Sequence, residues 1–171
     1  MPTLVQIEIR DLRPLDWPEV AAIYQDGIES GNATFEVAPP AWEDWNDAHS
    51  EIRLVAELDG RTAGWAALSP TSSRCCYRGV VENSVYVAAW AQGHGVGRAL
   101  LEELIARSEA AGIWTLVAGI FPENKASVRL HLGCGFRLVG VRERLGQMGG
   151  GELNGVWRDV LLLERRSEVV G

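Results

Sequence analysis

The stretch WAQGHGVGRALL, residues 90–101, places three glycines within five positions directly before a helical apolar pattern. Glycine loses more backbone entropy on folding than any other residue, so three of them together call for a structural or functional reason. The first backbone N–H groups of a helix have no partner inside the helix, and they attract anions. The stretch therefore predicts an anion-binding loop that leads into a helix.

Two common phosphate-binding motifs differ from this loop. The Walker motif requires G-x-x-x-x-G-K-[ST], and the loop contains no lysine followed by serine or threonine. The dinucleotide fingerprint requires G-x-G-x-x-G, but counting from Gly93 or Gly95 places Arg98 or Leu100 at the third glycine position. The spacing excludes both nucleotide motifs and leaves open which anion the loop binds.

Outside this loop, the apolar pattern predicts a mixed α/β chain built around one central sheet. Asp59-Gly60 between two apolar runs predicts a tight β-hairpin, and Asp16-Trp17-Pro18-Glu19 predicts a capping box that opens a helix. The apolar run TLVAGI at 115–120 predicts a strand that is buried on both faces. The spacing of apolar residues predicts further strands near 5–9, 80–87, 136–141 and 156–163, and helices near 42–49, 96–108 and 123–132.

The composition is that of a globular domain, with 171 residues of which 47% are hydrophobic and 23% charged. We expect a single domain over residues 1–171. The net charge of −7 argues against nucleic acid and against an anionic membrane surface as partners. No signal peptide is expected from the amino-terminal sequence, which favours a cytoplasmic location. Cys75, Cys76 and Cys134 lack metal-binding spacing, so we expect buried, reduced thiols and no metal.

The glycine loop resembles a known family signature. Gln92, Gly95 and Gly97 are similar to the [R/Q]-x-x-G-x-[G/A] motif of the GNAT acetyltransferase superfamily. The resemblance extends over residues 7–163, and the segments 32–45, 73–87, 123–136 and 155–160 look like the phosphinothricin and methionine sulfoximine N-acetyltransferase branch. It implies the GNAT fold of the α/β (α+β) class, with a twisted, mixed and mostly antiparallel sheet of about seven strands flanked by about four helices.

The same resemblance implies acetyl-CoA as the acetyl donor. Asn124 would contact its pantetheine arm, Ser127 would lie near its phosphates, and a backbone N–H near Val87 would stabilise the oxyanion. The backbone of Val85, Tyr86 and Val87 would pair with pantetheine like an added strand. The pyrophosphate would be held by the loop residues Gln92, Gly93, His94, Gly95, Val96, Gly97 and Arg98. The side chain of His94 could bond to a phosphate, but a solvated loop histidine is the favoured interpretation of it.

Acetyl transfer to an amine requires a neutral amine, a stabilised oxyanion and a leaving thiolate. Glu82 resembles the acidic residue of the family that precedes the glycine loop, and it is the candidate base. The alternative is a solvated carboxylate at a strand end. His131 stands where many members place a tyrosine thought to protonate the thiolate, and the alternative is a structural histidine that packs beside the cofactor.

The segment before Glu82 is the expected acceptor site. Arg74 and Arg78 could bind a substrate carboxylate, with Arg74 favoured by the resemblance, although either could form a surface ion pair. Cys76 and Val80 replace the usual alanine and threonine of the branch. The other expected substrate contacts are Phe35, Tyr77, Glu82 and Asn83.

The resemblance implies transfer of acetyl to the α-amino group of a small amino-acid-like substrate, such as phosphinothricin, methionine sulfoximine or methionine sulfone. It also implies a homodimer. Two alternatives stay open: an N-acetyltransferase for protein amino termini or another small amine, and a non-catalytic acyl-CoA-binding module.

Overall fold

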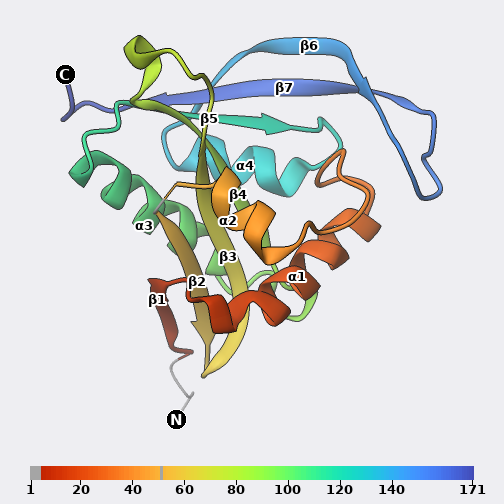
Figure 1. The fold of residues 1–171 in the computed structure, drawn as a ribbon, viewed down its shortest axis with the longest axis horizontal. Coiled ribbons are helices and arrows are strands. Elements are labelled where there is room, and N and C mark those ends of the chain that lie inside the picture. The colour runs from red at the N-terminus through yellow and green to blue at the C-terminus, as the bar shows by residue number, and fades with distance from the viewer. Residues whose placement is uncertain (1–4, 51) are drawn as a thin grey trace.

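The computed structural model describes residues 5–50 and 52–171, and these form one seven-stranded sheet flanked by helices (Figure 1). The strands are β1 (Ile7–Asp11), β2 (Arg53–Leu58), β3 (Arg61–Pro70), β4 (Val80–Val87), β5 (Thr115–Ile120), β6 (Arg137–Gln147) and β7 (Trp157–Arg166). The α-helices are α1 (Trp17–Glu29), α2 (Trp42–Ala48), α3 (Val96–Ala110) and α4 (Lys125–Gly133).

The strand order is β1-β2-β3-β4-β5-β7-β6, and only β4 and β5 run parallel. All other neighbouring pairs are antiparallel. The expectation of a mixed, mostly antiparallel sheet of about seven strands with about four helices is confirmed for the described residues. None of these helices is long and apolar enough to cross a membrane.

The predicted hairpin joins β2 to β3. Asp59 and Gly60 have φ angles of 51° and 79°, the left-handed conformation that a two-residue turn between twisted strands requires. Leu58 pairs with Arg61 across this turn. The hairpin thus sets the register of β2 against β3, and β3 pairs separately with β4 from Gly64↔Val87 to Pro70↔Val81.

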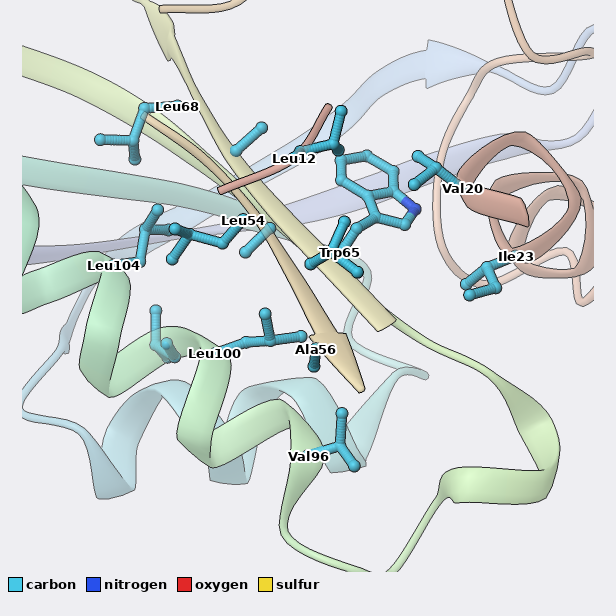
Figure 2. Close-up of a cluster of buried hydrophobic side chains, with 14 of the residues drawn as sticks. Leu12, Val20, Ile23, Leu54, Ala56, Trp65, Leu68, Val96, Leu100 and Leu104 are labelled. Atoms are coloured by element: carbon cyan, nitrogen blue, oxygen red, sulfur yellow. The ribbon is translucent and has the colours of Figure 1, made fainter. Parts of the chain in front are cut away.

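The helices cover opposite faces of the sheet. Trp65 of β3 points toward Val20 and Ile23 of α1 on one face of the sheet. Leu100 and Leu104 of α3 pack against the other face (Figure 2). On the α1 face, Trp65 contacts the rings of three aromatic side chains, and the full ring cluster on this face comprises Trp17, Tyr24, Trp42, Trp45, Trp65 and Tyr86. This cluster secures the short helix α2 against the sheet.

Three local expectations are wrong. The carboxylate of Asp16 does not cap α1, because it forms a two-pronged ion pair with Arg10, at 2.7 and 2.8 Å. The strand β5 is fully buried on one face only, and Gly119 on its other face is exposed. Cys75 and Cys76 are exposed, because they lie in a 3-10 helix, Cys75–Tyr77, on the surface loop between β3 and β4.

Candidate active site

The sheet separates between its two parallel strands. Residues 80–82 of β4 pair with residues 115–117 of β5, but β4 continues to Val87 and β5 to Ile120 without further pairing between them. On its other edge β4 stays paired with β3 through Val87. Alternate backbone N–H and C=O groups of residues 83–87 therefore face the gap, where they can bind an extended ligand like a neighbouring strand.

A cleft of about 790 Å³ opens at this separation and is lined by both strands. Successive side chains of a strand point to opposite faces, and β4 follows this rule. Tyr86 contacts the rings of Tyr24 and Trp65 on the α1 face, whereas Asn83 contacts His131 of α4 on the opposite face. Glu82 shares its face with Tyr86. The cleft is thus lined from both sides of the sheet, so two ligands can approach each other through the gap.

The predicted anion loop directly precedes α3. Gly93 and Gly95 have φ angles of 79° and 84°, which favour glycine strongly, and the helix begins at Val96. A side chain at Gly97 would lie within 3.4 Å of Leu130 and Val87, so the glycine lets α3 approach α4 and β4 closely. No side chain caps the N-terminus of α3, and its first turn contains no acidic residue. The loop therefore fits an anion such as pyrophosphate.

The side chains of the loop contribute less than its backbone. Gln92, His94 and Arg98 are exposed, and Arg98 forms an ion pair with Glu102 at 2.7 Å. His94 Nδ1 lies 3.0 Å from the Gln92 carbonyl oxygen. Val96 is buried in the core, so only its backbone can reach a ligand. These loop residues do not line the cleft itself, which lies nearer to α4.

The start of α4 holds two predicted cofactor contacts on the wall of the cleft. Asn124 caps the helix, because its Oδ1 accepts a hydrogen bond from the backbone N–H of Ser127 at 3.2 Å. Its Nδ2 donates to the carbonyl oxygen of Asn32 at 3.2 Å. Asn124 and Ser127 both line the cleft, so the cap places this end of the helix beside any ligand bound there.

His131 is held by a specific pair of hydrogen bonds. Its Nδ1 lies 2.8 Å from the carbonyl oxygen of Ser127, which can only accept, so Nδ1 carries the hydrogen. Its Nε2 lies 2.9 Å from Nδ2 of Asn83 and accepts in the neutral ring. Burial lowers the pKa of His131, which keeps the ring neutral at pH 7. Asn83 Oδ1 is buried without a partner among the described residues, and it can accept an N–H from a ligand such as an amide of pantetheine.

We expect nuclear magnetic resonance to find His131 neutral and protonated at Nδ1. Burial disfavours the charged ring, so its protonation midpoint should lie below the ordinary value of 6.5. Nitrogen-15 shifts of the ring identify the tautomer, and loss of the signal in His131→Gln assigns it among the three histidines. A midpoint above 6.5, or a hydrogen on Nε2, would contradict the geometry.

Glu82 lies on the cleft wall where β4 and β5 begin to separate. Burial raises the pKa of its carboxyl group, and the positive charge of Arg142 lowers it in part. A carboxylate whose pKa is raised toward neutrality is a better proton acceptor, which suits a general base. The position therefore brings the candidate base to the point where two ligands can meet.

The predicted substrate contacts divide into two groups. Phe35 lines the cleft with Glu82 and Asn83, and its ring packs edge-on against Phe121 at 4.9 Å. The second group is Arg74, Tyr77 and Arg78, which are exposed and do not line the cleft. Their side chains engage nearby aromatic rings instead: the guanidinium of Arg74 lies 5.5 Å from the Tyr77 ring centre, and that of Arg78 lies 5.4 Å from the ring centre of Trp114.

Two cleft residues have no signal in the sequence. Arg142 of β6 lines the cleft opposite β4, and His49 lines it just after α2. His49 Nδ1 lies 2.6 Å from the carbonyl oxygen of Trp45 and its ring stacks on the Trp45 ring, which fixes the orientation of the imidazole. Burial lowers the pKa of His49. The sequence places His49 at the end of the helix predicted near 42–49, but nothing in it indicates that this residue borders a cleft.

A free strand edge and an uncapped glycine loop at a helix start suit an extended donor that ends in an anion, and a carboxylate beside the gap suits transfer to an amine, as in the acyl-CoA-dependent transferases. Residues 9–136 match the sequence model of the Acetyltransferase (GNAT) family, and the chain belongs to this family. The protein is therefore an acetyl-CoA-dependent N-acetyltransferase. No group of three or more His, Cys, Asp or Glu side chains that could bind a metal ion occurs within residues 5–50 and 52–171.

Individual relatives confirm the predicted branch. The chain is 37% identical over 164 residues to the phosphinothricin N-acetyltransferase of Alcaligenes faecalis, covering 92% of this chain and 81% of the relative. It is 35% identical over 149 residues to the L-methionine sulfoximine/L-methionine sulfone acetyltransferase of Pseudomonas aeruginosa, covering 83% and 87%. The crystal structure of a GNAT superfamily phosphinothricin acetyltransferase from Sinorhizobium meliloti in complex with acetyl-CoA matches with a TM-score of 0.81 and 31% identity, covering 94% and 88%.

Proposed function

We propose that this enzyme acetylates the α-amino group of a small amino-acid-like substrate, of the phosphinothricin, methionine sulfoximine or methionine sulfone type. The observation that carries the proposal is the position of Glu82, whose carboxyl group has a raised pKa and borders the gap between β4 and β5. The identities to relatives with these substrates support it. In this proposal residues 1–171 form one acetyltransferase domain.

The acceptor side of the cleft lies on the face of Glu82. An α-amino group has a pKa of about 8, so removing its proton at pH 7 costs only ~1 kcal/mol. Glu82 takes this proton directly or through a water molecule. Phe35 contributes an apolar wall beside the amine, and Arg74, Tyr77 and Arg78 remain proposed outer contacts for the substrate.

The donor side of the cleft lies toward α3 and α4. Acetyl-CoA supplies the activated thioester when bound. The backbone of residues 93–98 would hold its pyrophosphate, and the free edge of β4 at residues 85–87 would bind its pantetheine arm and place an N–H at the developing oxyanion. Asn83, Asn124 and Ser127 would complete this side.

The proposed role of His131 follows from its hydrogen bonds. His131 could protonate a leaving thiolate only from Nε2, and this nitrogen accepts the Asn83 N–H in the neutral ring. The geometry thus favours the alternative of a structural histidine beside the cofactor, and we propose that the ring positions Asn83. Direct protonation of the thiolate by His131 would require Asn83 to release the ring.

The proposal is tested by measuring CoA thiol release from acetyl-CoA with a panel of acceptors. The panel contains phosphinothricin, methionine sulfoximine, methionine sulfone, ordinary amino acids and a peptide with a free amino terminus. Higher kcat/KM for the amino-acid analogues than for the peptide is expected. Preference for the peptide would support the protein N-terminal alternative, and tight acetyl-CoA binding without thiol release from any acceptor would support a non-catalytic module.

We also propose that the enzyme is a homodimer that acts in the cytoplasm. The strand β6 is at the edge of the sheet, and the β6–β7 hairpin extends past the neighbouring elements (Figure 1). Several of its apolar side chains are exposed: Leu138, Val139, Val141, Leu145 and Trp157. A second copy would cover them. Sedimentation equilibrium should give twice the chain mass, and a monomer at micromolar concentration would contradict the dimer.

The proposed cytoplasmic location is supported by three free cysteines.

A further inference from the structure

Arg142 points from β6 into the acceptor side of the cleft. It pairs with Val160 of β7, so both side chains lie on the same face of the sheet. Val160 packs with Phe121 and Phe35, which line the cleft. Arg142 is also close enough to Glu82 for its charge to lower the pKa of that carboxyl group. The guanidinium and the candidate base therefore border the same space.

The guanidinium of Arg142 has no partner within the described residues. No ion pair or hydrogen bond of its side chain is present among residues 5–50 and 52–171, and the side chain is exposed to the cleft. Two neighbours differ in this respect. Arg137, on the same strand, forms an ion pair with Glu164, and Arg158 on β7 is bonded to Glu123 and Asn32. The guanidinium of Arg142 is thus available for a ligand.

The charges around this space suit an amino acid. Among the described residues that line the cleft, Arg142 is the single lysine or arginine. An α-amino acid carries its ammonium and its carboxylate on one carbon atom, so its two charges match a carboxylate and a guanidinium that border one space, as Glu82 and Arg142 do. The planar guanidinium matches the two oxygens of a carboxylate. In contrast, Arg74 and Arg78 lie outside the cleft.

We propose that Arg142 binds the α-carboxylate of the acceptor while Glu82 faces its amino group. The inference rests on the proposed function and adds to it the residue that selects amino acids over simple amines. Because Arg142 contacts the substrate and not the thioester, its loss should weaken acceptor binding and leave acetyl-CoA binding unchanged.

The test compares Arg142→Gln with wild-type enzyme on L-methionine sulfone and on its carboxamide, which lacks the negative charge. The wild type should prefer the acid. Arg142→Gln should raise the KM for the acid by about tenfold or more, since hydrogen bonds between charged groups are worth ~1.5–3 kcal/mol. The KM for the carboxamide should be the same for both enzymes, so the preference in KM for the acid disappears. The KM for acetyl-CoA and the melting temperature should not change.

Two further variants make the result specific. Arg137→Gln removes an exposed arginine of the same strand outside the cleft and should behave as wild type. Arg74→Gln tests the arginine that the resemblance favours for the carboxylate. As an outer contact, its loss would weaken the acid and the carboxamide alike, and the preference for the acid should remain. The inference is overturned if Arg142→Gln retains that preference, or if Arg74→Gln loses it.

Phosphinothricin carries a phosphinate as well as an α-carboxylate, so it tests which of the two anionic groups Arg142 binds. If Arg142→Gln impairs phosphinothricin but not methionine sulfone, the arginine binds the phosphinate and the carboxylate assignment is wrong. If wild-type enzyme releases CoA with the peptide and with no amino acid, the proposed function fails and this inference fails with it. Activity of the wild type on the amino acids separates these two failures.

Discussion

Replacing Glu82 with glutamine is expected to lower kcat at neutral pH by about 10²–10⁴-fold, the usual contribution of a general base. The amide has nearly the same shape as the carboxyl group but cannot accept a proton. Glu82 faces the α1 side of the sheet, away from the glycine loop, so the affinity for acetyl-CoA should be almost unchanged. Steady-state kinetics and acetyl-CoA binding by calorimetry measure the two effects separately.

The pH profile gives the Glu82 variant a second readout. Burial raises the pKa of Glu82, so the carboxylate is lost as the pH falls through a value above that of an ordinary glutamate. Wild-type kcat/KM should fall along this acidic limb, and the limb should be absent in Glu82→Gln. Glu143→Gln, an exposed change on β6 outside the cleft, is the matched control. Unchanged turnover of Glu82→Gln at every pH would remove Glu82 from the mechanism.

The second large effect is expected for Gly95→Val. Gly95 has a φ of 84°, a conformation that a β-branched residue adopts only with strain. The loop should rearrange and turn several N–H groups away from the anion. Each such interaction at a helix start is worth ~0.3–1 kcal/mol, so the KM for acetyl-CoA should rise by about tenfold or more. Steady-state kinetics at saturating acceptor measures it.

The opposite end of the same helix provides the control for Gly95→Val. Gly112 follows α3 and has a φ of 78°, and neither glycine has a neighbour that a side chain would clash with. Both valine variants should lose ~1–2 kcal/mol of folding stability through the left-handed backbone. Only Gly95→Val should weaken acetyl-CoA binding. Equal KM values for acetyl-CoA in the two variants would show that the loop does not bind the donor.

Features of the fold with local causes were predictable from the sequence. Asp59-Gly60 determines its turn through two residues, and the glycines before α3 set the start of that helix through their own φ angles. The cap at Asn124 is equally local. The capping box predicted at Asp16 does not form, because the side chain of Arg10 on β1, six residues earlier, binds the carboxylate.

The residues on the acceptor side of the cleft come together through pairing between strands that are far apart in the sequence. Arg142 faces the cleft because β6 pairs with β7 in a register that places it opposite Val160. A shift of one residue would turn its side chain to the other face. The sequence has no signal for that register, so the resemblance drew attention to Arg74 and Arg78 instead. The strand β5 was expected to be buried on both faces because its residues form an apolar run. The face that contains Gly119 instead borders the cleft, which forms only when the strands pair.

The most direct test of the proposed reaction is product analysis with purified wild-type protein. Acetyl-CoA labelled with carbon-13 in the acetyl group is incubated with L-methionine sulfone, released thiol is titrated, and the product is identified by mass spectrometry. The expected result is N-acetyl methionine sulfone that carries the labelled acetyl group on its α-nitrogen, in equal amount to the CoA released. Release of CoA without acetylated amino acid, or binding of acetyl-CoA without turnover, would contradict α-amino acetylation in the cleft beside Glu82.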